Sequence, residues 1–395
     1  MTLVSIPNLD LVVSPVDNNV HWNLANYRRQ GFQNLHTIGR YVTSFRSQRV
    51  LPFRKDIDWT IGERPDVARF LSAPHFSGFV VARDDRVLYE SYASDFGPDR
   101  PHATMSITKV TLNIMLGRCV ADGLLDLDRR VKEYLPEIGT GYGEATVRAV
   151  ADMNVVNNYS ESSNVPGATP WFSVEAAAGL RSPPDDGIEL TIRSVLRGIT
   201  GDDLVNRTGH LIYKTASTEL LGWIVERVSK RPLSSWLIEI VEGAGLEGSF
   251  HIACDPEGVP LLGGGASLSA RDLARVGLLF ARRGKGVDGR SVADAAFIEE
   301  TRRDPGPPWP KPREGMYYSR QTTTNGTWIG HGGFGGQYLL ANPDTGIVVV
   351  YMAVFENHSG DSGEFYPPLI HMMADLAADE GPTLQHRIKQ DTSGT

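Results

Sequence analysis

The sequence contains only two cysteines in 395 residues, Cys119 and Cys254. Neither has a histidine or a second cysteine at the spacing of a metal-ligand motif, so the sequence supports neither a zinc site nor a disulfide framework. No run approaches the ~20 consecutive apolar residues of a membrane-spanning helix, and the N-terminus lacks the basic and apolar regions of a secretory signal. We therefore expect a cytoplasmic protein that binds no metal, no cofactor and no membrane.

The chain has no excess of basic residues either. It carries 39 Lys and Arg against 47 Asp and Glu, a formal net charge of -8. This charge argues against a surface that follows nucleic-acid phosphates, so we expect no nucleic-acid partner. The composition, 41% hydrophobic and 22% charged, is typical of a globular protein. The length favours one large mixed domain or two lobes around a shared cleft.

Strand patterns stand at the two ends of the predicted core. Residues 78–83 and 86–92 are β-rich runs around Asp84-Asp85 and predict a hairpin. After about residue 315, short runs of period two alternate with turn signals and predict an antiparallel meander that a helix near 369–378 follows. We assign these parts of the chain to one sheet lobe, residues 76–105 and 315–380.

Helical patterns fill most of the chain between those strands. Apolar residues at i, i+3 and i+4 predict a helix from Ser106 to about Gly123. A near-capping-box pair, Ser269 and Asp272, begins the clearest later helix, and weaker patterns predict three more, near 191–197, 217–228 and 232–241. Residues 106–314 are thus a mainly helical lobe inserted into the sheet lobe. We predict an α+β fold, an antiparallel sheet flanked by helices.

Three segments lack a strong period. Residues 1–75 are polar and interrupted by prolines, so we expect an irregular wrap over the core. Residues 154–188 are long enough to form a lid or a wall of an active-site pocket. We expect the polar tail, residues 381–395, to be disordered.

Ser106 and Lys109 place a hydroxyl and an amine three residues apart at the start of the first predicted helix. At this spacing the two side chains share one helix face and can reach each other. The positive end of the helix dipole favours an alkoxide-like serine, and burial can lower the pKa of a lysine enough for it to act as a base. Taken alone, the same pattern more often means a capping serine followed by a solvated lysine.

Two further segments could complete a site. Tyr213 immediately precedes a predicted helix and could offer its phenol to a cleft, or could be a core aromatic residue. The glycine-rich run 330–336 surrounds His331 and precedes a predicted strand. So many glycines weaken a strand unless something must approach its backbone closely, and a substrate is one such thing. The alternative is a flexible hairpin loop with an incidental histidine.

Together the three segments resemble the β-lactamase and penicillin-binding-protein superfamily, with its S-x-x-K, Y-x-[NS] and K-T-G or H-x-G elements in this order. Supporting similarity lies in residues 121–128, 131–137 and 342–346, so the resemblance spans about 77–355. It implies a β-lactamase/transpeptidase-like fold. His331 stands where many members have the lysine of K-T-G, so the permanent cation for a β-lactam carboxylate is missing.

The resemblance also implies roles for individual residues. Ser106 would be acylated by an amide or ester, with Lys109 or Tyr213 taking its proton and Tyr213 protonating the leaving group. The backbone N–H groups of Ser106 and Phe334 would form the oxyanion hole. The strand carrying His331, Gly332 and Gly333 would contact the substrate.

A narrower resemblance is to the 6-aminohexanoate-dimer hydrolases, through residues 21–26, 105–109, 221–228 and 269–277. It puts Glu175 approximately where those enzymes hold a substrate amine. Two positions depart from that branch: Ser163 stands where it can have a tyrosine, and Gly263 replaces an asparagine. Within the loop, the residues we single out as candidate substrate contacts are Tyr159, Trp171 and Glu175.

The sequence thus predicts a serine hydrolase that acts on a small linear amide. A carboxylesterase of the same fold is the main alternative. A D,D-peptidase, a β-lactamase and a catalytically silent binding protein are less favoured. The expected partner is a small-molecule amide or ester, and a homodimer stays open.

Overall fold

The computed structural model describes residues 9–13, 20–162, 165, 167–182 and 188–379. Its largest sheet has eight strands in the order β11-β12-β13-β14-β15-β4-β5-β3. All neighbours pair antiparallel except β3 and β5. The strands are β3 (Arg54–Lys55), β4 (Phe76–Arg83), β5 (Arg86–Tyr92), β11 (Tyr317–Ser319), β12 (Thr322–Thr324), β13 (Ile329–Gly333), β14 (Gln337–Ala341) and β15 (Ile347–Ala353).

The central strands of this sheet are buried on both faces. In β15, Val348 and Val350 belong to the core that contains α13 (Ala270–Ala281), whereas Val349 and Tyr351 belong to the core beneath α15 (Tyr366–Ala378). Successive side chains of a strand point to opposite faces, so helices on both faces explain why β15 is apolar throughout. Gly277 lets α13 close onto the sheet, because a Cβ there would lie 2.5 Å from Val348 Cγ1.

A second sheet lies where we predicted an irregular segment. Its order is β1-β2-β9-β10-β6, with β1 (Leu9–Val13), β2 (Tyr41–Arg46), β6 (His102–Ala103), β9 (Ser249–Ala253) and β10 (Ala266–Leu268). The irregular wrap predicted for residues 1–75 is therefore wrong for the described part of that segment. It also holds four helices, α1 (Arg28–Gln33), α2 (Leu35–Ile38), α3 (Trp59–Glu63) and α4 (Pro65–Leu71). The sequence did not predict β2, because this strand pairs with β9, which lies about 200 residues further along the chain.

The predicted hairpin and the main helices are confirmed. Asp84, with φ of 56°, turns the chain between β4 and β5. The helical part contains α5 (Val110–Ala121), α6 (Val131–Tyr134), α7 (Thr140–Gly143), α8 (Val147–Ala151), α10 (Ile192–Arg197), α11 (Thr215–Ser229), α12 (Leu233–Ala244) and α14 (Ala295–Arg303). Ser269 caps α13 by accepting from the Asp272 N–H, as its spacing predicted.

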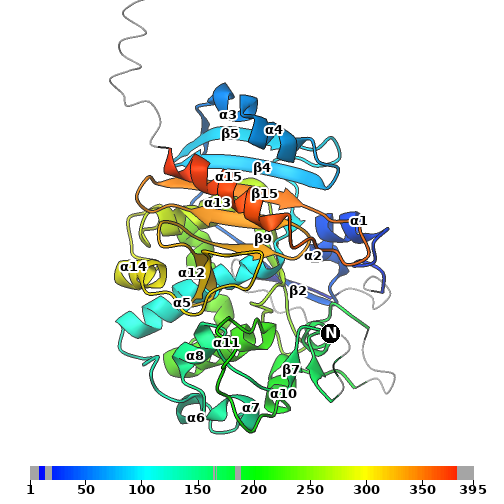
Figure 1. The fold of residues 1–395 in the computed structure, drawn as a ribbon, viewed down its shortest axis with the longest axis vertical. Coiled ribbons are helices and arrows are strands. Elements are labelled where there is room, and N and C mark those ends of the chain that lie inside the picture. The colour runs from blue at the N-terminus through cyan, green and yellow to red at the C-terminus, as the bar shows by residue number, and fades with distance from the viewer. Residues whose placement is uncertain (1–8, 14–19, 163–164, 166, 183–187, 380–395) are drawn as a thin grey trace, which may run out of the picture.

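The inserted helical lobe is visible in Figure 1 as the green helices beside the sheet. Its boundary differs from the prediction, because α13 falls within residues 106–314 but packs against β4, β14 and β15. The segment 154–188 has elements of its own, β7 (Tyr159–Ser160), β8 (Thr169–Pro170) and α9 (Phe172–Ala177). The tail 381–395 lies outside the described residues. Within the described chain, no helix has the length and apolarity to cross a membrane.

Candidate active site

Ser106 lies on a tight turn that leads into α5. The turn is a 3-10 helix, η2 (Met105–Lys109), instead of the first turn of the predicted α-helix. Met105 has φ of 48°, a left-handed conformation that costs energy in a residue with a side chain. Hydroxyl groups hold it there: Thr108 Oγ1 donates to the Met105 carbonyl at 2.7 Å and Thr104 Oγ1 to the Ala266 carbonyl at 3.1 Å. The surrounding structure thus fixes the position of the serine.

Lys109 is fully buried beside Ser106, with its Nζ 3.1 Å from Ser106 Oγ. The ammonium also donates to the Gly263 carbonyl and, at 3.5 Å, to Thr215 Oγ1. Burial lowers the pKa of Lys109 below its ordinary 10.5, while Glu161 and Glu219 oppose the shift. A lysine with a lowered pKa can accept the serine proton.

Tyr213 lies just before α11, with its ring 5.0 Å from Lys109 Nζ. The ring packs against Trp309 and Tyr318, at centroid distances of 5.8 and 5.9 Å. Its hydroxyl is buried and has no hydrogen-bond partner in the described part of the chain. Burial raises the pKa of the phenol far above 10, although Ser106 nearby lowers it in part. Tyr213 therefore carries its proton at neutral pH and can donate it.

The glycine-rich strand β13 runs directly beside the Ser106 turn. A Cβ at Gly333 would collide with the Thr104 carbonyl, so only glycine permits this approach. The next residue is Phe334. Within the described residues, the backbone N–H groups of Ser106 and Phe334 donate to no acceptor. Two free donors beside a nucleophile are what an oxyanion hole requires.

His331 is buried on β13, next to Tyr318. It is 2% exposed, with Nδ1 2.6 Å from the Gly332 carbonyl and Nε2 3.3 Å from the Tyr318 hydroxyl. Burial lowers the pKa of His331 to about 3, so the ring is neutral. His331, Gly332 and Gly333 do not line the cavity in front of Ser106. Their contact with substrate stays a prediction.

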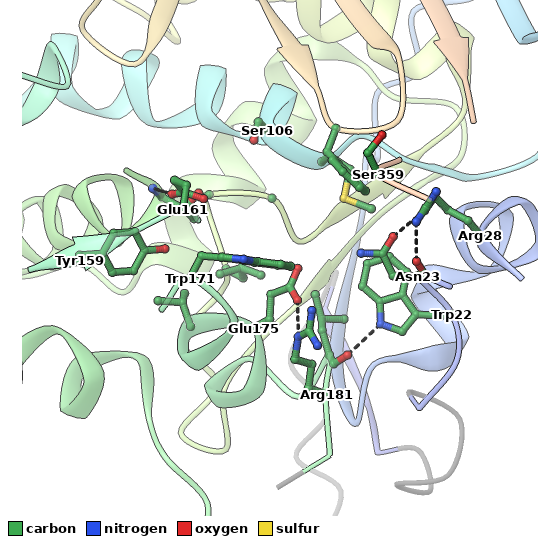
Figure 2. A pocket seen from close by; sticks show the side chains of 18 of the residues that line it. Trp22, Asn23, Arg28, Ser106, Tyr159, Glu161, Trp171, Glu175, Arg181 and Ser359 are labelled. Carbon is green, nitrogen blue, oxygen red and sulfur yellow. Dashed lines mark hydrogen bonds and ion pairs between the residues drawn. The ribbon is translucent and has the colours of Figure 1, made fainter. Parts of the chain in front are cut away.

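A cavity of about 440 Å³ opens on Ser106, a size suited to a small molecule. Figure 2 shows Glu161 and Tyr159 on one side of Ser106 and Trp22, Asn23 and Arg28 on the other. Candidates from the sequence that line it are Ser106, Tyr159, Trp171, Glu175 and Phe334. Lining residues that the sequence did not single out as contacts include Trp22, Asn23, Arg28, Glu161, Arg181 and Thr215. Ser163 lies outside the described residues.

The described residues between Tyr159 and Arg181 form one wall of the cavity, and the two carboxylates of this wall have different partners. Glu175 pairs with Arg181 at 2.7 Å, and Arg181 stacks over Trp171 at 4.8 Å. Burial raises the pKa of Glu175 to about 7, with Arg181 opposing the shift. Glu161 instead accepts the Thr215 N–H and has no cation within 4 Å among the described residues.

Tyr159 completes this wall. Its side chain is 1% exposed, and its hydroxyl has no hydrogen-bond partner in the described structure. Lys214 holds the segment by donating to the Tyr159 carbonyl. An unsatisfied buried hydroxyl costs about 1–3 kcal/mol, so a ligand that reached this group and bonded to it would recover that cost.

Comparison with known proteins agrees with this architecture. The family profile for Beta-lactamase matches residues 67–362, and the chain belongs to that family. It is 32% identical over 349 residues to a 6-aminohexanoate-dimer hydrolase from Paenarthrobacter ureafaciens, covering 84% of this chain and 86% of that protein.

Solved structures support the same fold. A protein from Bacillus anthracis, named as a candidate 6-aminohexanoate-dimer hydrolase, superposes with a TM-score of 0.77 at 18% identity, covering 93% of this chain and 98% of that chain. A penicillin-binding-protein homologue from Caulobacter crescentus gives a TM-score of 0.57 at 17% identity, covering 81% and 97%. The predicted β-lactamase/transpeptidase-like fold is thereby confirmed.

Proposed function

We propose that this protein is a serine hydrolase that cleaves a small linear amide through an acyl-enzyme on Ser106. The observation that carries the proposal is the buried Lys109 Nζ, 3.1 Å from Ser106 Oγ, behind a cavity that opens on the serine. A nucleophile within hydrogen-bond reach of a base is the arrangement that covalent hydrolysis needs.

In acylation, Ser106 Oγ attacks the substrate carbonyl and its proton passes to Lys109. The N–H groups of Ser106 and Phe334 stabilise the negative oxygen of the tetrahedral intermediate. Collapse of the intermediate breaks the C–N bond, and Tyr213 gives its proton to the leaving amine while Lys109 returns one to the phenol. Deacylation reverses this path. Water attacks the acyl-enzyme and gives a proton to Tyr213, Tyr213 passes one to Lys109, and Lys109 returns one to Ser106 Oγ as the acid leaves.

The charges of the cavity favour a substrate with polar ends. Glu161, Glu175, Arg28 and Arg181 all line it, so an ammonium and a carboxylate could each find an opposite charge. The 32% identical relative named as a 6-aminohexanoate-dimer hydrolase supports a linear amide. His331 stands where many members have a lysine, and its ring is neutral and buried outside the cavity lining, so no cation for a β-lactam carboxylate comes from this position, which argues against β-lactamase activity.

An esterase is the second candidate, because the cavity would admit an ester as readily as an amide. The two reactions differ at the leaving group. An amine must be protonated as it departs, whereas a nitrophenolate departs as an anion. Activity on activated esters alone, with no amide cleaved, would favour this second candidate.

The test is a substrate panel of linear amides, amino-acid amides and p-nitrophenyl esters, with products read by mass spectrometry. The wild type should cleave linear amides, and Ser106→Ala should cleave none. Equal turnover by both proteins would overturn the acyl-enzyme proposal.

A further inference from the structure

Glu219 is a buried carboxylate of α11 that the proposed mechanism does not use. It is 4% exposed and lies outside the cavity lining. Oε1 accepts the Gly263 N–H at 2.6 Å and Oε2 the Leu262 N–H at 3.3 Å. Among the described residues, no cation lies within 4 Å of it. Burial raises the pKa of Glu219 to about 8, although the two N–H donors and Lys109 oppose the shift, so the charges of Glu219 and Lys109 depend on each other.

The Gly263 peptide connects this carboxylate to Lys109. Its N–H donates to Glu219, and its carbonyl accepts from Lys109 Nζ. The chain of hydrogen bonds therefore runs from Ser106 through Lys109 and one peptide group to Glu219. Hydrogen bonds in such a chain polarise one another, so the negative charge strengthens the carbonyl as an acceptor for the ammonium.

Position 263 must be glycine for this arrangement. A Cβ there would collide with the Thr215 methyl and would lie 2.7 Å from Glu219 Oε1. Gly263 and Glu219 are thus a matched pair, since the missing side chain leaves the room that the carboxylate occupies. Gly263 stands where the related branch has an asparagine, and here a side chain at this position would collide with Thr215 and Glu219.

We propose that Glu219 is a positioning residue that holds Lys109 against Ser106 through the Gly263 peptide and, when it is ionised, favours the protonated form of Lys109. The inference rests on the proposed function. The charged and titratable groups that face Lys109 are Glu219 from α11, Glu161 from the cavity wall, Tyr213, and His331 from β13. Of these, Glu219 is joined to Lys109 through a single peptide group.

The sign of the expected effect follows from charge. A carboxylate near an ammonium favours the protonated lysine and raises its pKa. Glu219→Gln removes this charge, so Lys109 should lose its proton at lower pH. It also weakens the contact at Gly263, so the reaction should be slower even when Lys109 is neutral.

The experiment measures the rate at which a fluorophosphonate labels Ser106 between pH 5 and 10. In Glu219→Gln the acidic midpoint should move down by about one pH unit or more, and the plateau rate should fall about tenfold. Glu226→Gln is the matched control, because Glu226 lies on the same helix, caps the Leu233 N–H and pairs with Arg193. It should behave as wild type. An unchanged midpoint and plateau in Glu219→Gln would overturn the inference.

Glu219→Asp separates charge from position, and also serves if Glu219→Gln does not fold. The shorter carboxylate keeps the charge but draws back from Gly263, so the plateau should fall while the midpoint stays near the wild-type value. A wild-type plateau in this variant would show that the contact with Gly263 does not matter, against the inference.

A second measurement needs no activity. NMR titration of ¹³C-labelled lysine, with the Lys109 signal assigned from Lys109→Met, should give a lower Lys109 pKa in Glu219→Gln than in wild type. If the fluorophosphonate does not label Ser106, the proposed function fails, and this titration still decides the role of Glu219. Equal Lys109 titrations would exclude that role whatever the activity.

Discussion

The site has two sides that are built differently: the rear, behind Ser106, and the cavity wall in front of it. Behind it, the polar atoms of Lys109, Gly263 and Glu219 are joined in one hydrogen-bonded chain. In front, Glu175 of the wall pairs with Arg181, and the Tyr159 hydroxyl has no partner among the described residues. The Tyr213 hydroxyl, behind Ser106, also has no partner among the described residues, so the difference lies in the continuous hydrogen-bonded chain that reaches the serine from behind. Under the proposed function, this difference would place the chemistry behind Ser106 and the choice of substrate in the wall.

The largest effect should come from the rear. Lys109→Met removes the base, and kcat/KM should fall about 10³-fold for amides and esters alike, within the usual range for acid–base catalysis. The free energy of unfolding should stay equal or rise at pH 7, because a buried ammonium is costly there. Steady-state kinetics and thermal unfolding check both. A fall in kcat/KM of less than tenfold would contradict the assignment of the rear as the catalytic side.

Tyr213→Phe should have the next largest effect and should depend on the leaving group. Amide turnover should fall about 10²-fold because the amine leaves unprotonated. Turnover of a p-nitrophenyl ester with the same acyl group should fall much less. Parallel kinetics on the matched pair measure the difference. Equal losses would mean that Tyr213 does not act on the leaving group.

The wall should respond to pH through Glu175. Its pKa of about 7 means that it gains its negative charge between pH 6 and 8. KM for an amine-bearing amide should therefore fall about threefold to tenfold over this range, as for an ion pair in a partly buried site, and KM for a neutral ester should not. Glu175→Gln should abolish the dependence. An identical pH dependence for the neutral ester would exclude cation binding by Glu175.

The smallest effect should come from Tyr159→Phe. The lost hydroxyl has no partner among the described residues, so the free energy of unfolding should be unchanged or higher by up to about 1 kcal/mol. If the hydroxyl contacts substrate, KM should rise several-fold with kcat nearly constant. Lower stability together with an unchanged KM would contradict the view that the wall keeps this group for a ligand.

The sequence predicted the rear of the site better than the wall. Ser106, Lys109 and Tyr213 were found because each stands at the start of a helix, in short motifs with a fixed order. The contact of Lys109 with Gly263 could not be predicted, since it depends on how a loop 154 residues away crosses the helix.

The rest of the cavity lining comes from distant segments whose sequences show no helix or strand periodicity. Arg28 reaches the cavity because its guanidinium donates to the carbonyls of Phe355 and Asn357, at 2.7 Å each. Nothing near Arg28 in the sequence signals such partners. Glu175 was expected to face a substrate amine, but it pairs with Arg181. The sequence does not signal that pair either. The larger sheet was predicted, including the union of its two distant parts at β4 and β15, whereas β2 was missed because its segment carries no clear strand period.

The most direct test of the account is the mass of the peptide that contains Ser106 after the protein is mixed with a linear amide or a p-nitrophenyl ester and quenched in acid within milliseconds. We predict an added acyl group on Ser106 in wild type, a longer-lived adduct in Lys109→Met when an activated ester is used, and none in Ser106→Ala. Turnover of substrate with no acyl group on Ser106 at any time, or turnover by Ser106→Ala, would contradict it.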